Sequence, residues 1–335
     1  MKAIRYERFG GPEVLEYVEV PDPIPGAMEI LIETAATGVN FPDVRERLGV
    51  YNRAETRVGG VELPHIGGLQ VVGRVVDVGK NCDHALLGRK VMALMPQGAY
   101  AQRAVARADM LVTLADDADA TAMASLPCQG VTAFLALQVC ANLRAGESVL
   151  VQGAAGGVGS LAVQIAKALG AGTVIGTAST EARRSFVRGL GADHAIPYGA
   201  PDWPKVVENH TEGRGVDVIL EAIGGDGFEQ NFACLAMLGR QVVVGSTRGP
   251  GEPIAPRRLM AKAHSVVGFY LPTFYQRSDL IQHGLHFLAS GVAQGTIKAN
   301  VAKVLPLAQA SEAHQMLERR EVNGAIVLIP DASSR

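Results

Sequence analysis

The sequence predicts an α/β protein with two domains, one built on a doubly wound parallel sheet and the other mainly antiparallel β. Three observations lead to this prediction. The chain has 335 residues, which is more than a single hydrophobic core usually spans. Short β-type runs broken by Gly and Pro fill the chain up to about residue 120. Beyond about residue 122, short apolar runs alternate with helical segments, as in parallel sheets joined by crossover helices.

The composition excludes several classes of partner. The formal net charge is -2 without a basic block, so we expect no nucleic-acid partner, because binding to a phosphate backbone needs clustered Lys and Arg. The N-terminus is charged, and no apolar run reaches the roughly 18 residues that a membrane helix needs. We therefore expect a cytoplasmic protein without a membrane partner. Four widely spaced cysteines indicate reduced thiols and no zinc knuckle: Cys82, Cys128, Cys140 and Cys234.

The first domain is expected to span residues 1–122 and 271–335, and the second residues 123–270. Apolar runs in the first domain, as at 30–32, are typical of antiparallel strands. Residues 120–143 have helix-compatible apolar spacing, punctuated by Pro and Gly, and we expect them to bridge the two domains.

Six apolar runs in the second domain predict parallel strands covered by helices on both faces. The expected strands are 148–152, 173–176, 194–196, 216–220, 241–244 and 265–268. The alternation stops near residue 270. The chain then continues with an expected helix at 278–289, a strand at 301–304, a helix at 308–319 and a strand at 325–329.

A glycine-rich turn at 154–159 follows the first of these strands and precedes an expected helix at 158–169. A dinucleotide site needs a sharp turn, close approach of the backbone to the pyrophosphate, and tight packing of helix on strand. Glycines meet these needs, and the phosphates would face free N–H groups at the positive end of the helix dipole. The residues of the turn expected to contact the cofactor are Ala155, Gly156, Gly157, Val158 and Gly159.

Ala154 occupies the first glycine position of the usual motif, so the turn by itself is also compatible with an ordinary glycine-rich loop. The strand before it, the helix after it and the further strand-like runs favour dinucleotide binding.

The residues after the second strand favour NADPH over NADH. An NAD enzyme usually carries Asp or Glu about 20 residues beyond the turn, to bind the ribose 2′-hydroxyl. Here the strand ends without an acid, and Ser179 offers a hydroxyl while Arg183 or Arg184 offers a guanidinium. These groups suit a 2′-phosphate. The alternative, a solvated helix face, stays open for either arginine.

With this turn identified, the whole chain resembles the medium-chain dehydrogenase/reductase superfamily, and within it the zinc-independent quinone oxidoreductase branch. The segments that carry the resemblance, besides the turn, are GVNFPD at 38–43, RLGVY at 47–51, GLQVVG at 68–73, GAYA at 98–101, GVTA at 130–133 and GADH at 191–194. The resemblance implies a GroES-like β domain built from both chain ends, an inserted Rossmann domain and a cleft between them. It also implies a homodimer, commonly joined through the edges of the Rossmann sheets.

Zinc-dependent members of the superfamily place Cys where this chain has Asn40, His where it has Leu69, and a further Cys where it has Cys128. Catalytic zinc generally needs three protein ligands, and one thiol cannot hold the ion. We therefore expect no metal.

The resemblance also assigns cofactor contacts to particular positions. It places Thr132 near the nicotinamide, Ser179 and Arg183 at the 2′-phosphate, and Tyr198 near that phosphate. Loops after the later strands would line the nicotinamide half, and a C-terminal segment would close over the ribose. The positions concerned are Ile223, Gly224, Gly245, Ser246, Phe269 and Asn323.

Two features depart from the family pattern. Gln70 stands where many relatives carry Glu, and the stretch 52–63 is longer than usual. For His65, which follows this stretch, a solvated loop position is favoured over a position in the pocket.

Without zinc, hydrogen bonds must stabilise the negative charge that hydride transfer brings to the acceptor oxygen. The Asn40 amide and the Tyr51 phenol are the candidate donors, while Asp43 is expected to orient its neighbours or Arg47. The alternative that Tyr51 only packs against its neighbours, without donating to the substrate, stays open.

The expected activity is NADPH-dependent reduction of a quinone or another α,β-unsaturated carbonyl compound. The anions that form from such substrates need no strong general acid, whereas a simple ketone gives a harder alkoxide. Two alternatives stay open, which are an enoyl thioester reductase and an NADPH-binding redox sensor without catalysis.

Overall fold

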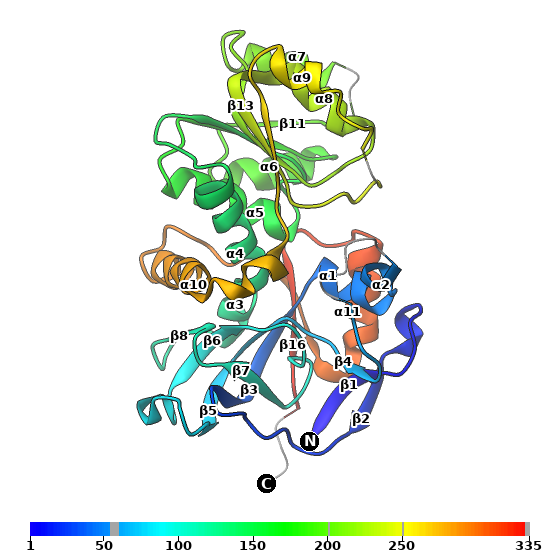
Figure 1. The fold of residues 1–335 in the computed structure, drawn as a ribbon, viewed down its shortest axis with the longest axis vertical. Helices are drawn as coiled ribbons and strands as arrows, with labels where there is room; N and C mark the ends of the chain where they lie inside the picture. The colour runs from blue at the N-terminus through cyan, green and yellow to red at the C-terminus, as the bar shows by residue number, and fades with distance from the viewer. Residues whose placement is uncertain (54–59, 200–201, 250, 332–335) are drawn as a thin grey trace. The chain divides into compact units, whose positions relative to one another are not determined.

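The computed structural model describes residues 1–53, 60–199, 202–249 and 251–331 (Figure 1). The chain divides into two compact units. Unit 1 comprises Met1–Val131, Pro272–Ala293 and Ala299–Arg335, and unit 2 comprises Thr132–Leu271 and Gln294–Lys298. None of the described helices is long and apolar enough to cross a membrane.

Unit 1 is built on a mainly antiparallel sheet to which both ends of the chain contribute. The sheet runs in the order β15-β16-β3-β5-β6-β8, and β7 pairs with β3. Its strands are β3 (Glu29–Val39), β5 (Gln70–Val78), β6 (Lys90–Leu94), β7 (Arg103–Arg107), β8 (Leu111–Thr113), β15 (Val301–Pro306) and β16 (Ala325–Ile329). The C-terminal β16 pairs antiparallel with β3, with Ile326 opposite Val39. Strands from both ends of the chain therefore meet in this sheet.

A smaller sheet in unit 1 has the order β2-β1-β4, formed by β1 (Lys2–Tyr6), β2 (Glu16–Glu19) and β4 (His65–Ile66). The helices of this unit are α1 (Phe41–Arg47), α2 (Val50–Arg53), α3 (Ala120–Ala124), α10 (Ser278–Ala293) and α11 (Ala310–Glu318). Short 3₁₀ turns lie at Pro12–Val14, His84–Leu86, Leu271–Gln276 and Leu307–Gln309.

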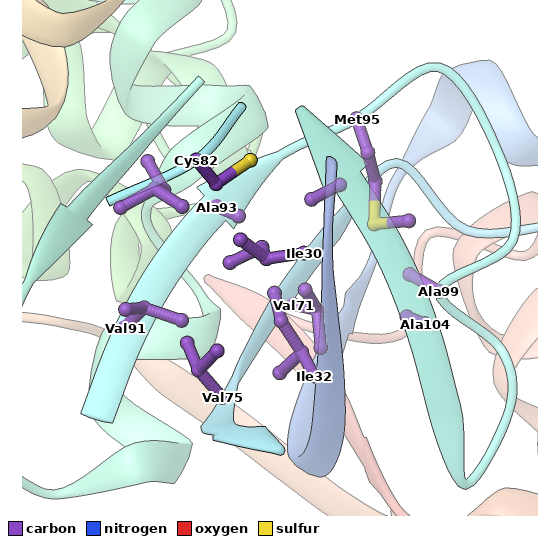
Figure 2. Close-up of a cluster of buried hydrophobic side chains, with 12 residues drawn as sticks. Ile30, Ile32, Val71, Val75, Cys82, Val91, Ala93, Met95, Ala99 and Ala104 are labelled. Carbon is purple, nitrogen blue, oxygen red and sulfur yellow. The ribbon is translucent and has the colours of Figure 1, made fainter. Parts of the chain in front are cut away.

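The core of unit 1 follows the alternation expected of strands, in which every second side chain points to the same face. Ile30 and Ile32 of β3 lie against Val71 and Val75 of β5, with Val91 of β6 beside them (Figure 2). All five side chains are at most 1% exposed. Each contributes roughly 1.5–3 kcal/mol through the transfer of its apolar surface from water.

Unit 2 contains a parallel sheet in the order β11-β10-β9-β12-β13-β14. Its strands are β9 (Ser148–Val151), β10 (Thr173–Thr177), β11 (His194–Ile196), β12 (Val216–Glu221), β13 (Leu235–Val243) and β14 (Ser265–Gly268). The chain proceeds from β9 outward to β11, and then from β12 outward to β14. The strand order therefore reverses between β9 and β12, where ligands of such sheets bind beyond the carboxyl ends of the strands.

The crossover helices of unit 2 are α5 (Gly157–Ala168), α6 (Glu181–Gly189), α7 (Trp203–Asn209), α8 (Asp226–Cys234) and α9 (Pro256–Met260). α5 packs on β9 and β10, and α8 packs on β12 and β13. The predicted doubly wound sheet is confirmed (Figure 1).

The segment predicted to bridge the domains is an interrupted helix. Asp119 caps α3 by accepting a hydrogen bond from the Thr121 N–H (2.9 Å). The helix stops before Pro127, because the residue preceding a proline disfavours helical geometry. α4 (Pro127–Phe134) then continues as a π-helix over Leu135–Cys140. Unit 1 extends to Val131, whereas the sequence-based boundary lies at residue 122.

Candidate cofactor site and active site

The glycine-rich turn joins the carboxyl end of β9 to α5. We call the backbone of this turn, between Gly156 and Gly159, the cradle. Gly156 is the residue before the first helical turn of α5. A Cβ atom on Gly159 would lie 2.4 Å from the Gly153 carbonyl oxygen, and one on Gly156 would lie 3.3 Å from it. The first N–H groups of a helix have no partner within the helix. The turn thus offers unobstructed donors to an anion, which fits the pyrophosphate of a dinucleotide.

The predicted 2′-phosphate residues lie beyond the ends of neighbouring strands. Thr177 of β10 pairs with Ile196 of β11, and Ser179 and Tyr198 each follow two residues later. Arg183 points an Nη1 atom to within 3.4 Å of the Ser179 hydroxyl oxygen.

Arg184 has a different environment. It forms an ion pair with Glu181 (2.9 Å) and donates to the Ser179 carbonyl oxygen (3.1 Å). Of the two arginines, Arg183 is therefore the one beside the Ser179 hydroxyl. Its role in cofactor binding stays a prediction.

The loop after β12 is held by a buried carboxylate that the sequence analysis missed. Glu221 is fully buried at the end of β12, and it accepts hydrogen bonds from the N–H groups of Ile223 (2.6 Å) and Gly224 (2.7 Å). The Asn231 amide also donates to it. Burial raises the pKa of Glu221, and these hydrogen bonds oppose the rise. The sequence signal for this arrangement is an acid at a strand end with two consecutive glycines three and four residues later.

Three of the predicted nicotinamide-side residues line one cavity of about 320 Å³, namely Gly224, Gly245 and Ser246. Thr132 on α4 and Phe269 after β14 are buried elsewhere in unit 2. Asn323 belongs to unit 1, in the segment before β16. The structure therefore brings three of the predicted nicotinamide-side residues together around one cavity, whereas Thr132, Phe269 and Asn323 do not line it.

In unit 1, Asn40 is held at the start of α1 by Asp43. The Asn40 backbone N–H donates to Asp43 Oδ2 (2.7 Å). Asn40 Nδ2 makes longer contacts with the same oxygen (3.3 Å) and with the Gly38 carbonyl oxygen (3.4 Å). Asn40 is 1% exposed, and among the described residues no donor reaches its Oδ1.

Asp43 also binds residues from distant parts of the chain. The Tyr100 hydroxyl donates to Asp43 Oδ2 (2.9 Å), and its oxygen lies 3.3 Å from His314 Nε2. Burial raises the pKa of Asp43 to about 7, while hydrogen bonds from Asn40, Tyr100 and Gly68 oppose the rise. Burial, assisted by the Arg47 charge, lowers the pKa of His314 to about 3. Tyr100 and His314 are therefore neutral supports of the Asp43 carboxyl.

Arg47 is fully buried and pairs with Glu318 (2.6 Å), not with Asp43. Of the two roles expected for Asp43, the contacts with Asn40 thus favour the orientation of its neighbours.

Replacing Asp43 by asparagine is expected to flatten the pH dependence of stability. The folded-state pKa of Asp43, about 7, lies above its ordinary value of 3.8, so its contribution is fully present below about pH 4 and is lost as the pH rises through 7. Between pH 5 and pH 8 the wild type should lose roughly 2.5 kcal/mol more of its free energy of unfolding than Asp43→Asn. Urea unfolding at both pH values measures this difference. The histidine contributions, of opposite sign, are common to both proteins, and parallel pH profiles would contradict the assignment.

For two residues near the predicted substrate side, Tyr51 and His65, the structure bears differently on the prediction. Tyr51 lies half-buried on α2, and its role as donor or packing residue stays a prediction. Residues 54–59, the middle of the stretch 52–63 that precedes His65, lie outside the described residues. The expected solvated position of His65 is wrong, since the residue is 4% exposed on β4 with its ring 5.2 Å from that of Tyr6. Burial lowers its pKa to about 4.

The positions that hold zinc in zinc-dependent relatives do not present a zinc donor set. Asn40 and Leu69 supply an amide and an alkyl group, and burial keeps the pKa of the Cys128 thiol well above its ordinary value. The Gln70 amide donates to the Ala124 carbonyl oxygen (2.6 Å) and accepts from the Cys128 N–H (2.5 Å). Across the described ranges, no group of three or more His, Cys, Asp or Glu side chains is arranged to hold a metal ion.

Comparisons with known proteins agree with this architecture. The family model described as alcohol dehydrogenase GroES-like domain matches residues 26–116, and the one described as zinc-binding dehydrogenase matches residues 157–290. The chain is 33% identical to 2-haloacrylate reductase from a Burkholderia species over 99% of both proteins. It is 34% identical to quinone oxidoreductase from Sus scrofa over 98% of both.

Among solved structures, quinone oxidoreductase from Escherichia coli complexed with NADPH aligns with a TM-score of 0.89 at 31% identity, covering 98% of this chain and 100% of that one. With full-length relatives above 30% identity and both of its units matched, the chain belongs to the medium-chain dehydrogenase/reductase superfamily, in the quinone oxidoreductase branch.

Proposed function

We propose that the protein is an NADPH-dependent oxidoreductase that transfers hydride, without zinc, to a quinone or another α,β-unsaturated carbonyl compound. The observation that carries the proposal is the Asn40 amide, whose backbone is bonded to Asp43, at the position where the family resemblance places a metal ligand in zinc-dependent relatives. The cradle at Gly156 and Gly159 supports a dinucleotide, and the Escherichia coli relative was solved with NADPH.

Bound NADPH supplies the hydride from its nicotinamide ring. The chain must then stabilise the negative charge that develops on the acceptor oxygen. Asn40 Nδ2 carries two N–H donors, and its contacts at 3.3 and 3.4 Å are long for hydrogen bonds. An oxygen that gains charge is a stronger acceptor than either present partner. Asn40 therefore donates to the substrate at small cost, while Asp43 keeps the backbone at Asn40 in place.

The unsaturated acceptor fits this machinery better than a simple ketone or alcohol. A quinone or an enone delocalises the charge, so its anion is protonated by water. The alkoxide from a simple ketone calls for a metal or a positioned proton donor. The similarity to 2-haloacrylate reductase adds α,β-unsaturated acids to the substrates to be tested.

Steady-state NADPH oxidation with a substrate panel tests the proposal. The panel contains quinones, enones, a 2-haloacrylate, enoyl thioesters and saturated ketones, each with NADPH and NADH in parallel. We expect turnover of the unsaturated carbonyl compounds and at least about tenfold higher kcat/KM with NADPH, which corresponds to one charge-assisted contact.

Three outcomes would contradict this proposal. A clear preference for enoyl thioesters would favour the thioester reductase, and tight NADPH binding without turnover would favour a redox sensor. Stoichiometric zinc in the purified protein would overturn the metal-free mechanism.

We further propose a homodimer joined through β14. This strand ends the sheet of unit 2 and pairs with β13 on one side. The Phe269 N–H donates to the Val243 carbonyl oxygen (2.9 Å), so by alternation the N–H of Val266 faces away from β13. A second copy of β14 could pair with that exposed edge.

Replacing Val266 by proline is expected to produce monomers. The substitution removes the outward N–H without disturbing the ladder to β13. Light scattering after size exclusion should give about twice the 35.2 kDa chain mass for the wild type and the chain mass for Val266→Pro. Val266→Ala, which keeps the N–H, is the matched control and should remain a dimer. A dimeric proline variant would exclude this edge as the interface.

A further inference from the structure

Arg248, which the sequence analysis did not assign to the cofactor, lies across the carboxyl edge of the sheet of unit 2. Its guanidinium carbon is 5.2 Å from the centroid of the Tyr198 ring. Tyr198 follows β11 and Arg248 follows β13, and β10, β9 and β12 lie between these strands in the sheet. The loop after β13 therefore reaches back to the far side of the sheet, where the ends of β10 and β11 are.

The backbone of this loop is anchored on the loop after β12. The Arg248 N–H donates to the Ile223 carbonyl oxygen (2.7 Å), and the Gly225 N–H donates to the Gly249 carbonyl oxygen (3.2 Å). A Cβ atom on Gly224 would lie 2.3 Å from that same Gly249 oxygen. These contacts fix the point from which the Arg248 side chain extends.

The guanidinium of Arg248 has capacity for an anion. Within the described part of the chain, no carboxylate forms an ion pair with it. The Arg248 guanidinium carbon lies over the Tyr198 ring in a cation–π contact. Such a contact uses none of the guanidinium N–H groups as a hydrogen-bond donor to a carboxylate, and these groups suit a phosphate.

Arg183 and Arg248 each lie beside a residue that follows one of two neighbouring strands, β10 and β11. Arg183 lies beside the Ser179 hydroxyl after β10, and Arg248 lies on the Tyr198 ring after the neighbouring β11. Arg184 is occupied by Glu181 and by backbone carbonyl oxygens. A phosphate monoester carries about -1.5 to -2 charges at pH 7, so a single arginine leaves part of its charge unpaired.

We propose that Arg248 is a second anion-binding arginine, which binds the 2′-phosphate of the cofactor and sets the preference for NADPH over NADH. The inference rests on the proposed function. It also gives a physical connection between the two halves of the cofactor site, because the backbone of Arg248 is bonded to the Ile223–Gly224 loop while its side chain lies at the adenosine end.

Binding measurements test this role without any need for turnover. Affinities of adenosine 2′,5′-bisphosphate and of 5′-AMP are measured by calorimetry, and those of NADPH and NADH by fluorescence. Arg248→Gln is expected to weaken the two 2′-phosphorylated ligands about 10- to 100-fold, as for a lost charge-assisted contact. The affinities of 5′-AMP and NADH, which lack the 2′-phosphate, should change less than about threefold in the same variant. Arg248→Lys keeps the charge and should recover part of the loss.

Arg257→Gln is the matched control, because it removes one exposed arginine of the same unit and should change neither ligand pair. A wild type that binds the bisphosphate and 5′-AMP equally would overturn both the NADPH assignment and this inference. A wild-type preference that Arg248→Gln retains would overturn the inference alone. Equal weakening of all four ligands would assign Arg248 a structural role and would also overturn it.

Discussion

Replacing Asn40 by alanine is expected to lower kcat about 100- to 1,000-fold, the usual effect of removing one donor to a developing oxyanion. Asn40 is 1% exposed and its Nδ2 contacts Asp43, so the alanine variant loses an amide donor whose position Asp43 holds. The affinity for NADPH should stay unchanged, because the cradle at Gly156 and Gly159 belongs to unit 2 and Asn40 to unit 1. Single-turnover reduction of a quinone by saturating NADPH measures the effect.

A second variant separates this chemistry from the structural role of Asn40 at the start of α1. In the part of the chain that the structure describes, no donor reaches Asn40 Oδ1. The structural difference between the variants is therefore the backbone preference of the N-cap position, where glycine costs only a few tenths of a kcal/mol and alanine is disfavoured. Asn40→Gly should therefore unfold at nearly the wild-type temperature and be as inactive as Asn40→Ala. A rate within about threefold of the wild type in the glycine variant would remove Asn40 from the catalytic step.

The parts of the structure that the sequence predicted are those with local signals. The strand–turn–helix around Gly156 and Gly159 could be predicted because its close packing excludes side chains there, while phosphate binding by the turn stays a prediction. The parallel sheet followed from apolar runs at regular spacing. For β13 we predicted a start at residue 241, whereas the strand begins at Leu235. Its pairing with β12 is irregular between Leu235 and Arg240, and an apolar run does not reveal such an irregular start.

The contacts that the sequence could not predict join residues far apart in the chain. Tyr100 is 57 residues from Asp43, and His314 is 214 residues from Tyr100. Nothing near any of them indicates that the others are close. His65 was misjudged because β4 has two residues, too few for an alternating pattern, so its burial depends entirely on pairing with β1.

Glu221 and Arg248 illustrate the same limit in unit 2. Each lies in or beside a loop whose residues look ordinary in sequence. Their positions depend on a backbone path that brings Gly249 to Gly225 and Arg248 to Tyr198. The glycine-rich turn could be predicted from its own residues, whereas the groups that we propose select the form of the cofactor depend on how three loops meet.

Replacing Gly159 by alanine is expected to abolish NADPH binding, with at least about a 100-fold loss of affinity, and to destabilise unit 2 by roughly 1–3 kcal/mol. The added Cβ would lie 2.4 Å from the Gly153 oxygen and 2.7 Å from the Ala154 Cα. Both are backbone atoms, so α5 must move away from β9 and the first N–H groups of the helix lose their alignment with the pyrophosphate. Fluorescence titration with NADPH and urea unfolding measure the two effects.

Two other glycine variants distinguish packing from phosphate binding. Gly189 at the end of α6 has open space where a Cβ atom would lie, so Gly189→Ala should keep full affinity and stability. Among the described residues, Gly156→Ala meets only the Gly153 oxygen within 4 Å, at 3.3 Å, so it should cost less stability than Gly159→Ala. It should still weaken NADPH binding, because a side chain at the start of α5 hinders close approach of a phosphate to the backbone. If Gly159→Ala bound NADPH as the wild type does, the pyrophosphate could not lie on this turn, and the cofactor site would have to be sought elsewhere along the sheet edge.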